Sequence, residues 1–286
     1  MSKIDQLALK QFIVSALQED IQDGDHTSLA CIPVSVLGKA QLKVKADGII
    51  CGIPVAKIVF ELVDPELEMF DIIEEGSNVK FGDIAFHVKG SANAILQAER
   101  VALNLMQRMS GIATLTQSYV QKIEGTNAKV IDTRKTTPNL RFLEKYAVTV
   151  GGGANHRMGL YDMIMIKDNH IDFCGGISKA LDAANAYLEK NNLQLKIEIE
   201  TRNIEEVKQV IQHGKADRIM LDNYTPEQMK PAVEMIGGRF ETEASGGINL
   251  QTIRSYAETG VDFISVGALT HSAVAFDLSL KAEIGK

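Results

Sequence analysis

Short apolar runs that end in polar residues recur from Ala128 to the C-terminal part of the chain, with helix-length stretches between the later ones. The runs read KVIDTRK, DMIMIKDN, LKIEIET, RIMLDN, FETEASGG and FISVGAL. Residues 203–213 have the apolar spacing of a helix, Thr225 and Pro226 can cap and begin another, and Asn249 can cap a third. Alternating strand and helix signals indicate parallel βα units. Six such units predict a partial or complete α/β barrel.

The first part of the chain, up to about residue 115, has a less regular rhythm. It begins with a helical pattern through Leu17, followed by an extended run at 38–52, a helix at 53–63 and extended runs near 69–73 and 84–88. A long helix is expected from Ala92, with an interruption near Ser110 and Gly111, because glycine and a short hydroxyl side chain weaken helix propensity. The pattern predicts a mixed α/β domain that ends near this point.

Composition narrows the class of protein. The chain has 286 residues, 45% of them hydrophobic, and a formal net charge of -7. This length can bury a large core, and the acidic balance argues against a general nucleic-acid surface. No apolar run approaches the ~20 residues that cross a bilayer, and charges interrupt the N-terminal apolar positions, unlike a signal peptide. Three isolated cysteines without CxxC spacing predict neither a disulfide framework nor a zinc site. We expect a cytoplasmic protein.

Basic residues cluster between two of the predicted strands, against the overall charge. They are Arg134, Lys135, His156, Arg157 and Lys167. A guanidinium can bind a carboxylate through two hydrogen bonds, and an ammonium can meet a phosphate or a second carboxylate. Arg134 and Lys135 alone are also compatible with an exposed strand end, but the additional cations favour a site for a small anionic ligand.

Two carboxylates follow consecutive predicted strands. Glu200 ends EIE and Asp222 ends MLD, and the C-terminal ends of barrel strands meet at one mouth. Carboxylate oxygens there could hold Mg²⁺ directly or through water. They could equally be ion-pair partners of the neighbouring cations.

Glycine-rich turns follow the last two predicted strands. Ser245, Gly246 and Gly247 form one turn, while Gly267 follows the final strand and precedes His271. Late barrel loops often bind phosphate through free backbone amides, although simple strand-to-helix turns would have the same composition. The run at 151–153 lacks the context of a dinucleotide fingerprint, so we exclude a Rossmann site and leave a conformational turn as its alternative.

The chain resembles the quinolinate phosphoribosyltransferase family over nearly its whole length. The resemblance begins at EDIQDGDHTS and continues through DGIICGIPVA and QAERVALNLMQRMSGIAT. It becomes specific in DTRKTTPNLR, GGGANHRMGLYDMIMIKDNHI, EIET, MLDN, EASGGI and SVGALTHS, which occur in the family's order.

The resemblance implies a type II phosphoribosyltransferase-like fold, with an N-terminal α/β sandwich-like domain and a partial α/β barrel. The implied domains are residues 1–115, the catalytic barrel at 116–270, and a return to the first domain at 271–286. It also implies a homodimer with shared active sites, or a higher oligomer built from it, in which Arg100 reaches the partner's site. No nucleic acid or membrane is expected as a partner.

The resemblance also assigns roles to residues. Catalytic roles fall to Lys135, Lys167, Glu200 and Asp222, and the last two would hold Mg²⁺. Substrate binding falls to Arg100, Arg134, Lys135, His156, Arg157, Lys167, Ser245, Gly246, Gly247, Gly267 and His271.

The implied reaction joins quinolinate to 5-phosphoribosyl-1-diphosphate and yields nicotinate mononucleotide, diphosphate and CO2 for NAD biosynthesis. Such an enzyme is a nicotinate-nucleotide diphosphorylase (carboxylating), a pentosyltransferase. Three alternatives remain: a related transferase for another heteroaromatic acid, a phosphosugar-binding barrel isomerase or lyase, and a binding protein without turnover, since a fold alone does not select a chemistry.

Overall fold

The computed structural model describes residues 6–283, which form two compact units. Unit 1 comprises residues up to 117 together with residues 142–152 and the C-terminal segment from Ala273. Unit 2 comprises residues 118–141 and 153–272. The segment 142–152 therefore packs in unit 1, although the boundaries expected near residues 115 and 270 assign it to the barrel.

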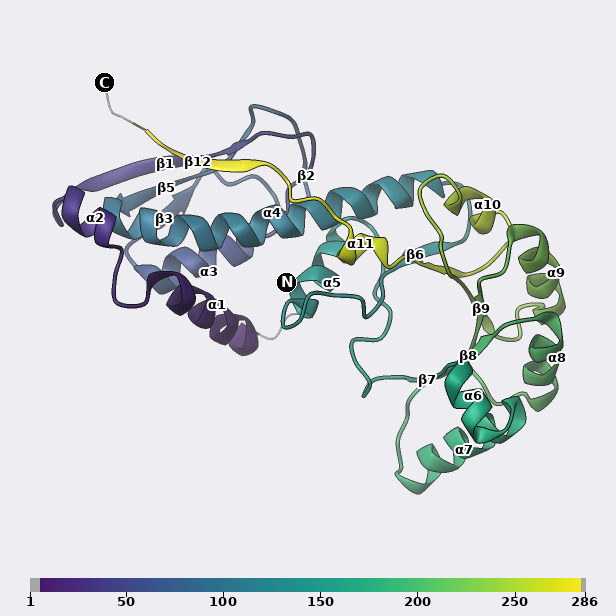
Figure 1. Ribbon diagram of the computed structural model, residues 1–286. Helices are drawn as coiled ribbons and strands as arrows, with labels where there is room; N and C mark the ends of the chain where they lie inside the picture. The colour runs from purple at the N-terminus through teal and green to yellow at the C-terminus, as the bar shows by residue number, and fades with distance from the viewer. Residues whose placement is uncertain (1–5, 284–286) are drawn as a thin grey trace. The chain divides into compact units, whose positions relative to one another are not determined.

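Unit 1 contains a four-stranded antiparallel sheet in the order β12-β1-β5-β3. Alternate residues of β1 are buried, among them Ala40, Leu42 and Val44, because successive side chains of a strand point to opposite faces. The last strand of the described chain, β12, pairs with β1 at the edge of this sheet (Figure 1). The strands of unit 1 are β1 (Leu37–Val44), β2 (Gly48–Ile49), β3 (Glu68–Phe70), β4 (Asn78–Val79), β5 (Ile84–Ser91) and β12 (Leu278–Ala282).

Helices provide the second layer of unit 1. Phe60 on α3 and Phe86 on β5 are both 1% exposed and meet edge to face, with ring centroids 6.1 Å apart. The helices are α1 (Gln6–Ile21), α2 (His26–Cys31), α3 (Ile53–Val63), α4 (Ala92–Lys122) and α5 (Arg141–Val150). A sheet covered by helices is the sandwich-like arrangement that was predicted for the N-terminal part.

The predicted interruption of the long helix is wrong, because α4 runs unbroken through Ser110 and Gly111. The Ser110 hydroxyl accepts a hydrogen bond from the Cys51 amide (2.9 Å) and donates one to the Cys51 carbonyl (3.0 Å). A Cβ at Gly111 would collide with the carbonyl of Val274. Tertiary contacts therefore explain both residues, and they override local helix propensity.

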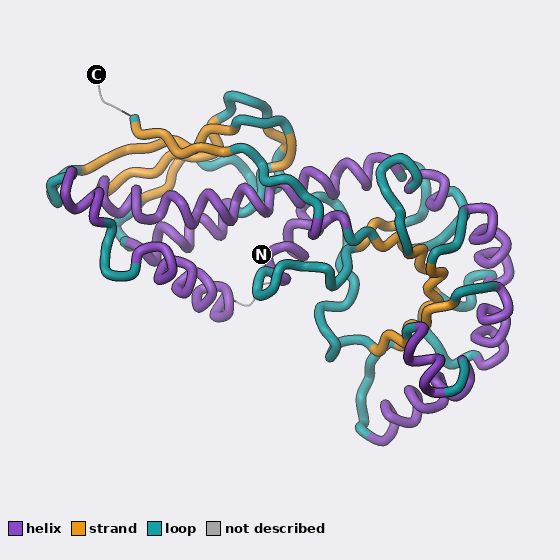
Figure 2. Tube along the Cα trace, in the orientation of Figure 1, coloured by secondary structure: helices purple, strands orange, loops and turns teal. Residues whose placement is uncertain are grey.

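Unit 2 contains a six-stranded parallel sheet in the order β6-β11-β10-β9-β8-β7. Within the described residues the edge strands β6 and β7 do not pair with each other, so the sheet is a partial barrel, as predicted. Its strands form an arc with helices along the outer side (Figure 2). The strands are β6 (Lys129–Ile131), β7 (Ile164–Ile166), β8 (Ile197–Thr201), β9 (Arg218–Asp222), β10 (Glu241–Ser245) and β11 (Phe263–Ser265).

The predicted cap at Thr225 is confirmed, whereas the cap predicted at Asn249 is wrong, because α10 begins only after Thr252 and Asn249 instead accepts from the Gln251 and Thr252 amides. Asn203 caps α8 through the Glu206 amide, and Thr225 caps α9, with Pro226 at its first position. Residues on the outward face of the strands, such as Ile199 and Leu221, are fully buried. The helices are α6 (Asp168–Cys174), α7 (Ile177–Lys190), α8 (Ile204–His213), α9 (Pro226–Ile236), α10 (Ile253–Ala257) and α11 (Ala268–His271).

The glycine run at 151–153 ends α5 in unit 1. Only Gly152 of the three has a positive φ (89°), and a Cβ at Gly151 would collide with the carbonyl of Ala113. The run therefore serves as a turn and a close contact with α4. Over residues 6–283, no helix is long and apolar enough to cross a membrane.

Candidate active site

A cavity of about 830 Å³ opens at the C-terminal ends of the unit 2 strands. Cavity-lining residues alternate along the strands, as in Met220 and Asp222 of β9 or Glu243 and Ser245 of β10, because alternate residues share one face of a sheet. Twelve residues predicted from the sequence line it: Arg134, Lys135, His156, Arg157, Lys167, Glu200, Asp222, Ser245, Gly246, Gly247, Gly267 and His271.

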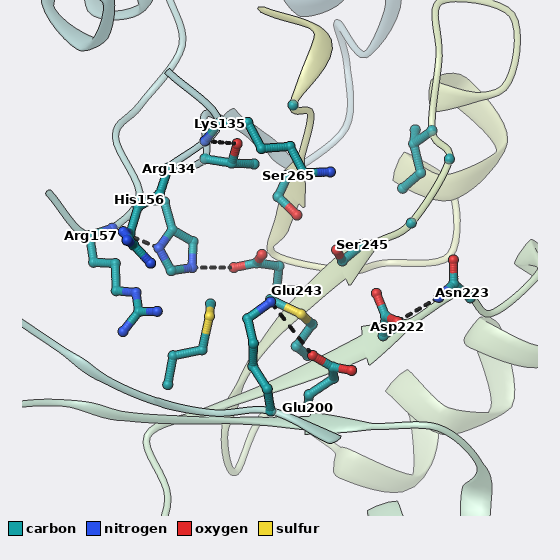
Figure 3. Close-up of a pocket in the computed structure, with 18 of the residues that line it drawn as sticks. Arg134, Lys135, His156, Arg157, Glu200, Asp222, Asn223, Glu243, Ser245 and Ser265 are labelled. Atoms are coloured by element: carbon teal, nitrogen blue, oxygen red, sulfur yellow. Dashed lines mark hydrogen bonds and ion pairs between the residues drawn. The ribbon is translucent and has the colours of Figure 1, made fainter. Parts of the chain in front are cut away.

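One side of the cavity carries two guanidinium groups, on Arg134 and Arg157 (Figure 3). Burial and the positive charge of Arg134 lower the pKa of Arg157. Within residues 6–283, no carboxylate forms an ion pair with Arg134 or Lys135. Neighbouring cations without a protein counter-charge favour an anion between them.

Glu200 on β8 and Asp222 on β9 reach the cavity from adjacent parallel strands. Burial raises the pKa of both carboxyl groups, and the charge of Asp222 raises that of Glu200 further. Lys167, directly after β7, offsets this in part, with its Nζ 4.0 Å from Oε2 of Glu200. Carboxylate oxygens are the ligands that Mg²⁺ prefers, and a divalent cation would relieve the raised pKa values, so the two residues fit a magnesium site.

The loop after β10 supplies backbone rather than side chains to the cavity. Gly246 and Gly247 have φ values of 100° and 63°, which favour glycine. A Cβ at Gly246 would collide with the side chain of Asn223, which itself adopts a positive φ of 57°. The Asn223 amide group donates to Asp222 Oδ2 (2.5 Å), so this close packing also orients the Asp222 carboxylate (Figure 3).

Gly267 and His271 border the cavity after β11. A Cβ at Gly267 would lie 3.0 Å from Cδ of Lys135 and 3.2 Å from Nε2 of His271, so glycine gives both side chains room. The His271 ring is exposed, and its Nδ1 lies 2.7 Å from the Ser272 hydroxyl.

His156 lines the cavity but is almost fully buried, with 7% of the residue exposed. Its Nε2 lies 2.9 Å from Oε2 of Glu198 and 3.3 Å from Oε2 of Glu243, while its Nδ1 accepts a hydrogen bond from the Arg157 amide (2.7 Å). Burial alone would lower the pKa of His156, but the two carboxylates outweigh burial and raise that pKa to about 9. Both ring nitrogens are thus engaged by the protein: Nε2 faces the two carboxylates, and Nδ1 accepts from the Arg157 amide.

Sequence reasoning missed Glu198 and Glu243, whose carboxylates face the His156 ring, and Arg218, which pairs with Glu243. Burial and the charge of Glu243 raise the pKa of Glu198 to about 7, and Arg218 NH1 lies 3.0 Å from Glu243 Oε2. A signal existed: Glu198 and Glu200, like Glu243 and Ser245, are two residues apart on strands, which places each pair on one face. Polar side chains therefore occur not only at the predicted strand ends but also two residues earlier, deeper in the barrel.

The remaining predicted residue, Arg100, lies on α4 in unit 1. Its side chain is exposed, and it is not among the residues that line the cavity.

Known proteins resemble the chain over both units. The family model "Quinolinate phosphoribosyl transferase, C-terminal domain" matches residues 112–281, and the corresponding N-terminal domain model matches residues 25–110. The chain is 48% identical to "Quinolinate phosphoribosyltransferase [decarboxylating] 1b" of Nicotiana tabacum, covering 96% of this chain and 82% of that protein. It is 41% identical to "Probable nicotinate-nucleotide pyrophosphorylase [carboxylating]" of Bacillus subtilis, covering 96% and 93%.

Solved structures agree with these sequence matches. NadC from Streptococcus pyogenes superposes with a TM-score of 0.94 at 38% identity and covers 99% of both chains. The nicotinate-nucleotide pyrophosphorylase from Francisella tularensis gives 0.92 at 37% identity and covers 98% of both.

Proposed function

This chain belongs to the quinolinate phosphoribosyltransferase family, and we propose that the unit 2 cavity is where it joins quinolinate to 5-phosphoribosyl-1-diphosphate. The protein is a nicotinate-nucleotide pyrophosphorylase (carboxylating), which forms nicotinate mononucleotide, diphosphate and CO2 in NAD biosynthesis. One observation carries the assignment of the site. Arg134 and Lys135, which form no ion pair with a carboxylate of residues 6–283, lie on one side of the cavity, and two carboxylates with raised pKa values lie on another (Figure 3).

Quinolinate occupies the cationic side. Its two carboxylates meet the guanidinium groups of Arg134 and Arg157, each able to donate two parallel hydrogen bonds, with Lys135 beside them. His156 lies beside this side of the cavity and offers no free ring nitrogen to a ligand. An aromatic diacid fits this side because Met165 and Met220 line the same cavity with apolar surface.

The phosphoribosyl substrate occupies the other side. Glu200 and Asp222 would hold Mg²⁺, directly or through water. The backbone of Gly246, Gly247 and Gly267 would approach phosphate oxygens, and Ser245 and His271 would donate hydrogen bonds from their side chains. When bound, the metal would neutralise charge on the diphosphate.

Positioning and electrostatics supply the catalysis in this proposal. As diphosphate departs, positive charge develops at the ribose carbon and the pyridine nitrogen captures it from a prealigned position. When the neighbouring carboxylate leaves as CO2, the electron pair of the broken bond stays on the ring carbon, where the positive charge of the now quaternary nitrogen stabilises it, and this carbon then takes up a proton. Lys135 and Lys167 both line the cavity and would stabilise negative charge in these steps.

Turnover with purified protein tests the function. Quinolinate with 5-phosphoribosyl-1-diphosphate and Mg²⁺ should give nicotinate mononucleotide and one CO2 per product, and nicotinate should be a much poorer acceptor because it lacks the second carboxylate. Equal turnover of nicotinate would identify a transferase for another heteroaromatic acid instead. Binding of both substrates without product would identify a binding protein.

We further propose a homodimer in which Arg100 contributes to the active site of the partner subunit. The support is that Arg100 lies exposed on α4 and does not line the cavity of its own chain, although its AER segment matches the family motif. A cytoplasmic location stays a prediction from the sequence.

A further inference from the structure

Three strands place a layer of charged side chains below the cavity. Glu198 on β8 and Arg218 on β9 lie opposite each other near the start of their strands, Glu243 lies in the middle of β10, and the two glutamates are 0% exposed. Glu243 borders the cavity, whereas Glu198 and Arg218 do not. The His156 ring completes the layer, with its Nε2 2.9 Å from Oε2 of Glu198 and 3.3 Å from Oε2 of Glu243. Figure 3 shows the His156 ring beside Glu243.

Filling the interior of a barrel with this charged layer costs more desolvation free energy than filling it with apolar side chains. Branched apolar side chains usually occupy such positions. Burying ions costs solvation free energy that their mutual attraction does not reliably return, so replacing a buried ion pair by apolar residues is often neutral or stabilising. Stability alone therefore does not explain the two adjacent buried carboxylates. A role in positioning other side chains of the site explains them.

The layer is rigid because Arg218 is fixed on three sides. Its Nε and NH2 donate to Glu241 Oε2 (3.1 and 3.0 Å), and its NH1 donates to Glu243 Oε2 (3.0 Å). The guanidinium carbon also lies 4.1 Å from the centroid of the Phe263 ring. Glu243 thus meets Arg218 on one side and His156 on the other, which fixes where the imidazole can sit.

The imidazole in turn fixes the chain that carries Arg157. The Arg157 amide donates to His156 Nδ1 (2.7 Å), and the His156 amide donates to Asp132 Oδ1 (2.9 Å). The Arg157 guanidinium donates to the Met163 carbonyl (3.1 Å). A movement of the His156 ring would therefore move the backbone from which the Arg157 guanidinium reaches the cavity.

We propose that Glu198 and Arg218 are positioning residues for the quinolinate half of the site: they act through Glu243 and His156 to place Arg157, and they touch neither substrate. The inference rests on the proposed function. It distinguishes the two substrates, because Arg157 belongs to the quinolinate half of the site, whereas Glu200 and Asp222 hold the phosphoribosyl half.

Steady-state kinetics of Glu198→Gln test the proposal. The substitution keeps the shape of the side chain and removes the charge that faces His156. We expect the KM for quinolinate to rise about tenfold, as a displaced binding group costs, with the KM for 5-phosphoribosyl-1-diphosphate within about twofold of the wild-type value. A quinolinate KM unchanged in folded protein would overturn the proposal. If Glu198→Gln does not fold, Glu198→Asp keeps the charge but shortens its reach, and the same KM comparison applies.

Glu206→Gln is the matched control, because it removes a buried glutamate in the same unit that pairs with Arg202 (2.7 Å) away from the cavity. It should lower the melting temperature and leave both KM values unchanged. A quinolinate KM raised equally by both variants would show a general structural effect and would overturn a specific positioning role.

A double-mutant cycle shows whether Glu198 acts through His156. In a His156→Gln background, Glu198→Gln should cause no further rise in the quinolinate KM, since the group it positions is absent. Fully additive effects would overturn the route through the imidazole. Wild-type protein that forms no nicotinate mononucleotide would instead refute the proposed function, so the two failures are distinguishable.

Discussion

At the scale of single residues, the guanidinium groups of Arg134 and Arg157 form the wall that would receive the two acid groups. Replacing Arg134 by alanine removes one charge-assisted partner, which is worth about 1.5–3 kcal/mol. We expect the KM for quinolinate to rise on the order of 10- to 100-fold, with a smaller change in the KM for 5-phosphoribosyl-1-diphosphate. Initial rates at varied concentrations of each substrate measure this.

Arg239→Ala is the control for that variant, because Arg239 lies outside the cavity and donates only to the Ile236 and Met235 carbonyls. Its quinolinate KM should match the wild type. An Arg134→Ala protein with the same quinolinate affinity as the wild type would remove Arg134 from the binding site.

Replacing Asp222 tests its proposed role in holding Mg²⁺. Asp222→Asn keeps the shape but removes the charge, so the Mg²⁺ concentration needed for half-maximal rate should rise on the order of tenfold, while quinolinate binding changes little. Asp182→Asn, an exposed aspartate that pairs with His213, is the control. Identical magnesium titrations for Asp222→Asn and the wild type would count against the metal role.

His156 gives the protein a pH-dependent contribution to stability. Its pKa is raised from 6.5 to about 9, so the folded state binds the proton more tightly than the unfolded state does. This contribution to the free energy of unfolding is complete below pH 6.5 and is lost as the pH rises through about 9. Denaturant unfolding between those pH values should show a steeper decline for the wild type than for His156→Gln; parallel curves would show that His156 does not titrate this way.

Most residues of the cavity could be predicted from sequence because they stand at the ends of apolar runs. Arg134, Lys167 and Asp222 each follow such a run, and parallel strands bring these ends together. The direction of the His156 side chain could not be predicted, since it depends on Glu198 and Glu243, which lie 42 and 87 positions further along the chain.

At the scale of elements, the turn after β10 depends on two glycines with different surroundings. Ala at Gly246 (φ 100°) would meet Asn223, whereas Ala at Gly247 (φ 63°) would meet open space. In both variants, backbone strain should lower the free energy of unfolding by more than about 1 kcal/mol. Gly246→Ala should also displace Asn223 and the Asp222 carboxylate that it orients. The KM for 5-phosphoribosyl-1-diphosphate should therefore rise more in Gly246→Ala than in Gly247→Ala; equal values would contradict this packing role.

Helix α4 shows where element prediction fails and why. Ser110 and Gly111 have low helix propensity, so local reasoning predicts a break, yet both are explained by partners distant in sequence, Cys51 and Val274. The cap at Thr225 was predicted correctly because its hydroxyl accepts from the Gln228 amide, only three residues away.

At the scale of the whole molecule, sequence periodicity predicted the parallel barrel, while the pairing of β12 with β1 has no local signal, because the two strands lie more than two hundred residues apart. The expectation of a C-terminal segment that returns to the first domain came from the family resemblance.

The proposed sharing of active sites between subunits would be a property of the whole assembly. If Arg100 serves the partner subunit, mixing Arg100→Ala protein with Lys167→Ala protein should restore up to about one quarter of wild-type activity after subunit exchange, since only one site in each mixed dimer is intact. Size-exclusion chromatography with differently tagged subunits would verify the exchange. No recovery in exchanged dimers would place Arg100 outside the partner's site.

The most direct measurement is a crystal structure with quinolinate, Mg²⁺ and an unreactive analogue of 5-phosphoribosyl-1-diphosphate bound together. We expect both carboxylates of quinolinate to bind Arg134 and Arg157, and the metal to bind Glu200 and Asp222. The pyridine nitrogen should face the ribose carbon within one cavity. Quinolinate bound elsewhere, or the two ligands held in separate cavities, would contradict this expectation.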